Sequence, residues 1–494
     1  MTQNMNDMQK KYVKNSLVET IGYFLGTISV SILGFIISLL YSYFYSPADY
    51  GVYSLVFSAY SLLSAVYGGW IALSLVRNIE KYRYLNQEND FWGTVYISHF
   101  FMSLIFWAAG LLIIKIANLE PIYNQLVFVL SLVYFFEYFL SITNTRFRTL
   151  GMSKAYSLNT TLNNLFKIIL LLLLYYMFNI KSIIGIGLSV LLTEILQVCF
   201  LTCKHKLYVY FKIKFYNKHI LKYLFIYGFP LMGISITTWI LNVSDRYIIR
   251  LFWPESQVGL YSYAYSLGNA LFSLLIQFIM LGAYPRIVKA WEYHGKEQAG
   301  QVISQYLKLY FYILIPACFG VTGVAKNMFI ALTNERYHES FPVFIVTCLS
   351  ITVLGLTQYT NKAWELNGNT KVVLMFNLMA AGINVLLNFL LVPVFGYQIA
   401  AWTTLTAYLV YLIIAFILSK KYVDINIDIR SLIKVFLSSG ALFCAVALID
   451  KINAISTRLE LVFQIVAGIL VYAIFMLVLK EINIIQIKEM LRKE

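Results

Sequence analysis

The sequence predicts an all-helical membrane protein with about fourteen transmembrane helices. The first observation is a series of fourteen apolar stretches, each about the 20 residues that a helix needs to cross a bilayer core, with little chain between them. The second is composition, because the 494 residues are 60% hydrophobic and only 12% charged, with a mean hydropathy of +0.72. The third is an internal repeat, which predicts two six-helix lobes and two extra C-terminal helices.

The apolar stretches place the helices along the chain and orient them. An even number of crossings leaves both termini on the same side of the membrane. Lys and Arg are unequally divided, with 28 on the side of the termini and 7 on the other, so the positive-inside rule predicts that both termini are cytoplasmic. The expected helices are 21–44, 52–75, 91–114, 125–145, 159–178, 183–203, 223–249, 259–283, 305–328, 340–363, 372–394, 399–419, 435–450 and 460–479.

Composition and motifs also exclude several classes of function. The net charge of +15 comes from basic residues in short loops between apolar stretches, where topology accounts for them, so we expect no nucleic-acid partner. The five cysteines all fall in expected helices without a second pair of metal ligands, so no metal site is expected. Gly295-Lys296 lacks the remainder of a phosphate-binding loop. We therefore expect no cofactor and no ATP-driven step.

The repeat rests on two matched pairs of segments. Residues 46–54 and 254–262 both contain Pro followed by Gly, an apolar residue, Tyr and Ser. Residues 151–154 align with 368–371, and the same register aligns Asn144 with Asn361. Each pair is separated by about six helices, an even number, so the two lobes enter the membrane in the same direction. The predicted divisions are a cytoplasmic tail 1–20, an N-lobe 21–203, a basic linker 204–222, a C-lobe 223–419, helices 13 and 14 in 420–479, and a cytoplasmic tail 480–494.

The same segments resemble a known family. Ser46 to Ser54, Asp245-Arg246-Tyr247 with Gly259-Leu260-Tyr261, and the stretch from Asn384 to Asn388 with Pro393 to Gly396 and Ala400-Ala401 are similar to the polysaccharide transporter family. This family belongs to the superfamily that also holds multidrug extruders and the lipid II flippase. The resemblance covers essentially the whole chain, and it implies that the two six-helix lobes surround a central cavity.

The resemblance implies a function, a substrate and a location. It implies alternation between inward-open and outward-open states, so that an O-antigen or capsule repeat unit carried on undecaprenyl diphosphate is flipped across a bacterial inner membrane. Coupling to a proton or sodium gradient, as in an antiporter, and association with a polysaccharide polymerase complex are further implications. Membrane lipids are the remaining expected partners.

Polar residues inside the expected helices predict the site, because such residues usually face a cavity or a partner. Asn159, Asn163 and Lys167 are spaced by four and form one stripe on their helix. A diphosphate requires cations, and sugars require hydrogen-bonding groups. The predicted substrate-cavity residues are Asn159, Asn163, Lys167, Arg246, Asn269, Gln277, Asn377, Asn384 and Asn388, and Arg77 and Arg148 are expected at the cytoplasmic mouth.

Ion coupling would require an acidic group within the membrane. Glu137, Glu194 and Asp245 are the acids well inside the expected helices, so they are the predicted coupling residues. Glu137 and Lys167 could instead form a purely structural pair, and the amide stripes could simply join helices. The basic linker could lie on an anionic leaflet or could serve topology and solvation alone.

Other functions stay open at this point. A flippase for lipid II or another lipid-linked glycan is the first alternative, and a multidrug extruder is the second, although the cations Lys167 and Arg246 do not suit a site for cationic drugs. A polysaccharide polymerase or ligase is least expected, because its catalytic loop has no counterpart among outer loops of about ten residues. The chain is therefore not expected to be an enzyme.

Overall fold

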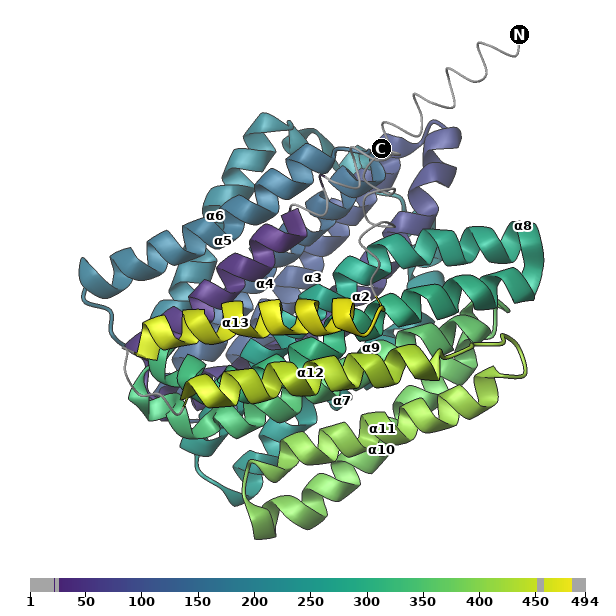
Figure 1. The fold of residues 1–494 in the computed structure, drawn as a ribbon. Helices are drawn as coiled ribbons and strands as arrows, with labels where there is room; N and C mark the ends of the chain where they lie inside the picture. Colours follow the sequence, from purple (N-terminus) through teal and green to yellow (C-terminus); the bar gives the residue numbers. More distant parts are fainter. Residues whose placement is uncertain (1–21, 23–25, 451–456, 482–494) are drawn as a thin grey trace. The chain divides into compact units, whose positions relative to one another are not determined.

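The computed structural model describes Gly22, residues 26–450 and residues 457–481, and all regular elements in this part are helical (Figure 1). The predicted tail 1–20 lies outside the described residues, as does the predicted tail 480–494 beyond Glu481. The elements are a first helix Gly26–Phe44, α2 (Pro47–Tyr84), α3 (Glu88–Ile116), α4 (Pro121–Thr149), α5 (Ser153–Tyr176), α6 (Ile184–Lys204), η1 (Leu207–Tyr210), η2 (Ile213–Phe215), α7 (Lys218–Phe252), α8 (Glu255–Leu332), η3 (Glu335–Ser340), α9 (Phe341–Glu365), α10 (Thr370–Phe395), α11 (Ile399–Ser419), α12 (Ile429–Asp450) and α13 (Thr457–Val478).

Helix α8 contains two membrane crossings. A straight helix of its 78 residues would be about 117 Å long, several times the thickness of a bilayer core. Its helical geometry breaks at Gly295, where φ is +78°, a conformation that glycine adopts readily. The two arms then run side by side, since the Arg286 guanidinium lies 6.0 Å from the centre of the Tyr306 ring. Figure 1 shows α8 doubling back in this way.

The helix count agrees with the sequence. In the described part of the chain, twelve helices are long and apolar enough to cross a membrane. Counting both arms of α8 and adding the 35-residue α7 gives the fourteen crossings that were predicted. The expected loop 284–304 is helical except at Gly295, because Lys, Glu, Ala and Gln favour helix where the chain leaves the apolar stretch.

The chain divides into two compact units. One comprises Ala48–Val243 with the described residues up to Ile37, and the other comprises Ser38–Pro47 with the described residues from Ser244 onwards. The division falls within α7, whereas the sequence placed its lobe boundary at the linker 204–222. The predicted domain boundaries stay a prediction, and each unit is described below by itself.

The internal repeat is visible in two matching turns. The turn between α4 and α5 has Gly151 at a φ of +69°, and the turn between α9 and α10 has Gly368 at +71°. In the first, the Met152 N–H donates to the Phe147 carbonyl at 2.8 Å, and in the second the Asn369 N–H donates to Trp364 at 2.9 Å. Both close their helix in the Schellman manner, which requires a left-handed residue. The turns share the register predicted from the sequence.

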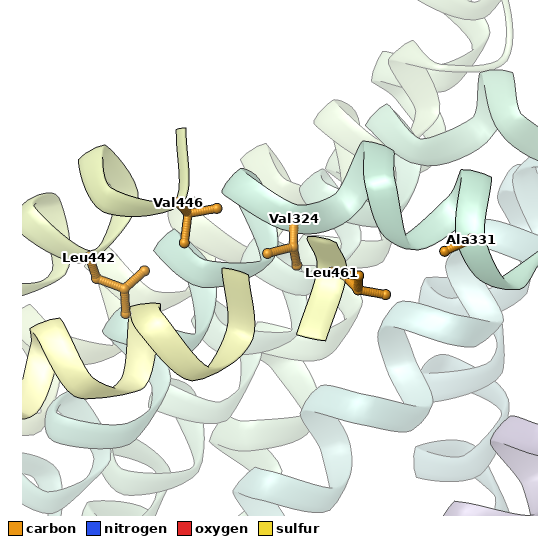
Figure 2. Packing of buried hydrophobic residues seen from close by; sticks show 5 residues of the cluster. All are labelled: Val324, Ala331, Leu442, Val446 and Leu461. Carbon is orange, nitrogen blue, oxygen red and sulfur yellow. The ribbon is translucent and has the colours of Figure 1, made fainter. Parts of the chain in front are cut away.

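The C-terminal helices α12 and α13 pack on the second arm of α8 (Figure 2). Without a hydrophobic driving force in lipid, helices associate through close packing and polar contacts. A Cβ added to Gly323 of α8 would lie only 2.8 Å from Val446 Cγ1, so glycine permits this approach of α8 and α12. The buried cluster consists of Val324, Ala331, Leu442, Val446 and Leu461.

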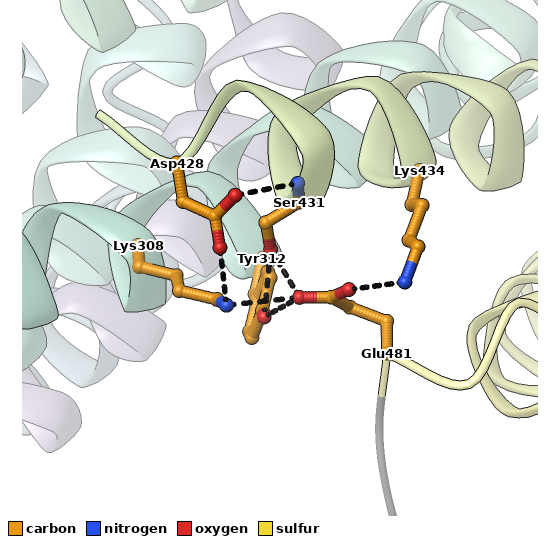
Figure 3. A network of polar contacts seen from close by, with 6 residues as sticks. All are labelled: Lys308, Tyr312, Asp428, Ser431, Lys434 and Glu481. Carbon is orange, nitrogen blue, oxygen red and sulfur yellow. Dashed lines mark hydrogen bonds and ion pairs between the residues drawn. The ribbon is translucent and has the colours of Figure 1, made fainter.

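A polar network joins the same three helices at the other end of α12 (Figure 3). The Glu481 carboxylate, just after α13, lies 3.0 Å from both the Lys308 and Lys434 ammonium groups. The Lys308 ammonium also lies 3.0 Å from Asp428 Oδ2. Hydrogen bonds to Glu481 from Tyr312 and Ser431 complete the network. It fixes the ends of α12 and α13 to α8.

Candidate functional site

A cavity of about 340 Å³ lies among α4, α5 and α6 in the first unit. Four charged side chains line it, Glu137 and Arg148 from α4, Lys167 from α5 and Glu194 from α6. The spacing of four residues along α5 places Asn163 and Lys167 on the same face, and both line the cavity. Two predicted coupling acids and the predicted cation are therefore gathered around one space.

Lys167 and Glu194 form the ion pair of this cavity. Lys167 Nζ lies 3.9 Å from Glu194 Oε1, which is long for a direct pair. The Lys167 side chain is 25% exposed and the Glu194 side chain 2%. Glu194 Oε2 is buried and has no hydrogen-bond partner among the described residues. A carboxylate in this position is poorly compensated, because its one ion-pair partner among the described residues is Lys167.

Glu137 has a different partner. The Tyr60 hydroxyl of α2 donates a short hydrogen bond to Glu137 Oε2. Among the described residues no ion pair joins Glu137 to Lys167, so the structural pair considered from the sequence is replaced by Lys167–Glu194. Nothing in the sequence indicates this choice of partner, because the choice depends on which faces of α4 and α6 turn toward α5.

A chain of amides borders the charged groups. The Asn163 side-chain amide donates to Gln197 Oε1 at 2.7 Å, and Gln197 Nε2 donates to the Asn159 carbonyl at 2.9 Å. Asn159 in turn donates to Asn144 Oδ1 at 2.7 Å. Asn159 is therefore buried behind the lining, where it orders the amides of its neighbours. The sequence analysis missed Gln197, although its spacing of three from Glu194 places both on one face of α6.

The two residues predicted at the cytoplasmic mouth lie in different surroundings. Arg148 lines the cavity near the end of α4, and its guanidinium lies 5.9 Å from the centre of the Tyr156 ring. Arg77 is exposed on α2 and donates to the Tyr227 hydroxyl at 3.1 Å. Arg77 is not among the residues lining this cavity. Its assignment to the mouth stays a prediction.

The second unit contains a closed polar network around Asp245. The carboxylate is fully buried and accepts hydrogen bonds from Asn388 Nδ2 at 2.6 Å and Thr404 Oγ1 at 3.0 Å. The Tyr261 hydroxyl donates a third, short bond. Asn384 is also fully buried and donates to Thr404 at 3.0 Å. In this conformation Asn384 and Asn388 hold Asp245 rather than face an open space, and their place in a substrate cavity stays a prediction.

The remaining predicted cavity residues are spread over the second unit. Arg246 is 9% exposed, donates from Nε to Ser262 Oγ at 3.1 Å and lies 5.5 Å above the Tyr265 ring. Asn269 accepts from Ser273 at 3.0 Å, and Asn377 donates to the Val373 carbonyl of its own helix at 3.1 Å. Gln277 is exposed. Their roles as cavity residues stay predictions, as does the coupling role of Asp245.

Comparison with known proteins identifies the family. A family model described as "Polysaccharide biosynthesis protein" matches residues 16–291, more than half of the chain. The chain belongs to the polysaccharide biosynthesis protein family. No curated protein sequence matches it. The family predicted from the sequence motifs is thereby confirmed.

The fold of this family member is similar to that of several solved transporter structures. The lipid II flippase MurJ, in an inward-closed conformation, has a TM-score of 0.73 at 17% identity, covering 92% of this chain and 98% of that one. A MOP superfamily transporter from Pyrococcus furiosus has a TM-score of 0.58 at 14% identity, covering 83% and 95%. An outward-facing multidrug transporter of the MATE family has 0.56 at 15% identity, also covering 83% and 95%.

These likenesses concern the fold. They confirm that this polysaccharide biosynthesis protein has the two-lobed, multi-pass architecture of MOP transporters, with two further helices at the C-terminal end. Within the described residues no group of three or more His, Cys, Asp or Glu is placed to hold a metal ion. The charged cavity in the first unit is the candidate site on this fold.

Proposed function

We propose that this protein flips an anionic, lipid-linked oligosaccharide from the cytoplasmic to the outer leaflet by alternating access. The observation that carries the proposal is the single lysine in a polar cavity of a polysaccharide biosynthesis protein with a transporter fold. The fold is similar to that of a flippase named for lipid II, and flipping is a reaction that such an architecture can perform. The substrate we propose is an O-antigen or capsule repeat unit on undecaprenyl diphosphate.

The chemistry of the cavity suits the charged head of this substrate. Lys167 supplies the cation that a diphosphate requires, and Asn163 and Gln197 supply donors and acceptors for the first sugar. A volume of about 340 Å³ is at the lower end of the range for small-molecule sites. We therefore place the diphosphate and the adjoining sugar here, with the rest of the oligosaccharide outside this cavity.

Coupling to an ion gradient follows from the loose pair in the same cavity. A diphosphate that takes Lys167 as its partner leaves Glu194 without one, and an uncompensated carboxylate in a buried position is costly. A proton or a sodium ion taken up by Glu194 removes that cost. Binding of the anion at Lys167 and of the cation at Glu194 are then linked in free energy, which is the condition for coupling. Glu137, held by Tyr60, and Asp245 are the further candidates.

The location proposed is the bacterial inner membrane, with both termini cytoplasmic and a polysaccharide polymerase complex as a partner. Single cysteines at Gln87, Asn118 and His294 test the orientation, since all three sites lie in the described chain between expected crossings. Gln87 and His294 should react with a membrane-impermeant reagent only after the cytoplasmic side is opened, and Asn118 should react in intact cells. Equal reaction of Gln87 and Asn118 in intact cells would contradict the orientation.

The decisive experiment reconstitutes the full chain in vesicles with a fluorescent undecaprenyl-diphosphate oligosaccharide. Dithionite added outside bleaches the outer leaflet alone, so protein-dependent loss of the protected signal measures flipping. Acceleration of at least tenfold over protein-free vesicles is expected, with a neutral polyprenyl glycoside as the control that should not be flipped. A multidrug extruder would instead leave the lipid untouched and move a cationic dye, and a polymerase would lengthen the oligosaccharide.

A further inference from the structure

The basic linker 204–222 exposes several apolar and lysine side chains on one surface. Between Glu194 and Asp245 the sequence contains no Asp or Glu, while six lysines lie within this segment. Ile213 is 85% exposed, Tyr208 56% and Tyr216 40%. An almost fully exposed isoleucine between Lys212 and Lys214 is unfavourable in water. Transport through the cavity does not use this surface.

The segment is held in place by contacts on its other side. Leu207 is fully buried, and the Tyr210 hydroxyl accepts a hydrogen bond of 2.7 Å from Arg146 Nη2 of α4. The Arg146 guanidinium also lies 4.7 Å from the centre of the Tyr210 ring. Thr94 of α3 accepts from the Asn217 N–H at 2.9 Å. The exposed residues therefore project from a fixed backbone of two short 3₁₀ helices, η1 and η2.

These contacts fix the depth of the segment in the membrane. Thr94 lies six residues after the start of α3 at Glu88, about 9 Å along the helix, and Arg146 lies in the last turn of α4. The segment thus lies against the membrane-entering ends of two crossing helices, on the side that the Lys and Arg distribution assigns to the cytoplasm. This is the depth of lipid headgroups, where amphipathic side chains are favoured.

We propose that the exposed face of residues 206–216 is a binding surface for anionic phospholipids of the cytoplasmic leaflet. Ile213 enters the upper acyl region, Tyr208 and Tyr216 lie at the headgroup level, and Lys206, Lys212 and Lys214 contact the phosphates. Charge complementarity selects this occupant, because the segment has no acid of its own. The neighbouring acids Glu80 and Glu88 are paired with Arg83.

The α8 turn offers a matched control on the same predicted side. Lys289 and Lys296 are exposed there, but Glu292 and Glu297 are exposed beside them, so the turn carries little net charge. Its loop position and lysine content resemble those of the linker, whereas its charge balance differs. Substitution of these two lysines therefore tests the effect of removing lysines in general.

Depth is tested with a fluorescent label on Ile213→Cys, in the full chain with its five native cysteines replaced by alanine and reconstituted in phosphatidylglycerol–phosphatidylcholine vesicles. The label should be protected from a water-soluble quencher at least fivefold more than the same label on His294→Cys, and quenched by a lipid-borne quencher. Equal accessibility of the two labels to the soluble quencher overturns the proposal and leaves the surface facing water, as a docking site for a soluble acidic protein would.

Lipid selectivity is tested with the same fluorescent label on Ile213→Cys. Its quenching by anionic lipids that carry a quencher is compared with its quenching by zwitterionic lipids that carry the same quencher. A lysine near a charged leaflet contributes about a fivefold preference, so Lys206→Gln, Lys212→Gln and Lys214→Gln together should lower the preference for anionic lipid at least fivefold. Arginine at the same three positions should retain it, and glutamine at Lys289 and Lys296 should change it less than twofold. Unchanged preference in the triple glutamine variant, with normal gel filtration and melting, overturns the proposal.

Discussion

The hairpins α4–α5 and α9–α10 share one backbone structure but differ in where their polar side chains lie. Both turns use a left-handed glycine with the same backbone hydrogen bonds. In the common register Lys167 of α5 corresponds to Asn384 of α10, and Glu137 of α4 corresponds to Leu354 of α9. The first hairpin therefore presents charges to an open cavity. The second presents a fully buried amide to a closed network around Asp245.

This difference shows that the two halves of the repeat share their backbone geometry but not the charge and polarity of their side chains. The geometry of the turn depends on one glycine and on the hydrogen bonds that close the helix. The glycine and these hydrogen bonds are present in both hairpins. The polar faces of the helices carry no such constraint. The first half has a loosely paired lysine, Lys167, and the second half has a fully hydrogen-bonded carboxylate, Asp245. A loosely paired charge can change partners, whereas a fully bonded one stabilises a single packing. We therefore expect mutations in the first cavity to affect transport and those in the second network to affect stability.

The largest effect is expected at Lys167. Lys167→Ala removes the cation that binds the diphosphate, so flipping of the fluorescent lipid should fall to the protein-free rate, while Lys167→Arg should retain part of it. Surface polysaccharide in a deletion strain, normalised to protein level, provides the matching cellular measurement.

The control for Lys167 is the corresponding position of the repeat. Asn384→Ala should lower the melting temperature but leave the flipping rate of the folded fraction within a few-fold of the parent. Normal flipping by Lys167→Ala would show that the cavity does not bind the charged head of the substrate. A Lys167→Ala protein that fails to accumulate would mean that the pair with Glu194 is structural.

The next largest effect concerns the stability of the second network. Asp245→Ala leaves Tyr261, Asn388 and Thr404 without their common acceptor, so it should lower the free energy of unfolding by about 3 kcal/mol or more. The measurement is thermal unfolding in detergent, with Glu194→Ala as the comparison, which should cost less because Glu194 has one loose partner. If Asp245→Asn melts like the parent but flips without response to a gradient, Asp245 is a coupling residue instead.

The sequence predicted the fold far better than the partners within the site. Length and hydropathy were sufficient for the helices, because each helix depends on residues close together in the chain. Of the predicted stripe, Asn163 and Lys167 line the cavity and Asn159 lies behind it, as helical spacing permits, and their role in substrate binding stays a prediction. The partner of Lys167 was not predictable, because Glu137 and Glu194 lie on separate helices whose rotation is set by packing. The enclosure of Asn384 depends on α11 in the same way.

A smaller effect is expected from neutralising the acids of the open cavity. Glu194→Gln retains the shape of the side chain and resembles its protonated form, so it should reduce flipping driven by an imposed pH or sodium gradient several-fold while sparing substrate binding. Glu137→Gln should have a weaker effect, because the Tyr60 hydroxyl can still donate to the amide oxygen. Gradient responses equal to the parent in both variants would make these acids structural.

The smallest effect tests whether a polar network outside the membrane-spanning segments, the one around Glu481, also stabilises the fold of the second unit. Glu481 lies beyond α13, and although burial raises its pKa, hydrogen bonds from Ser431, Tyr312 and two lysines lower it well below its usual range. Hydrogen bonding by the Ser431 N–H and contact with Lys308 likewise lower the pKa of Asp428. A carboxyl whose pKa is lower in the folded state stabilises the fold above its unfolded pKa, near 4, and this contribution is lost as the pH falls toward the folded value.

Glu481→Gln should therefore lower the free energy of unfolding at pH 7 by about 1 kcal/mol, since the network is partly exposed. The difference from the parent should persist at pH 6 and shrink below about pH 4, where the unfolded carboxyl takes up its proton. Thermal unfolding of both proteins across this range measures the effect, and the flipping rate of the folded variant should match the parent. A difference that grows as the pH falls, or a variant that melts normally at pH 7 yet flips slowly, would show that this network controls transport rather than stability.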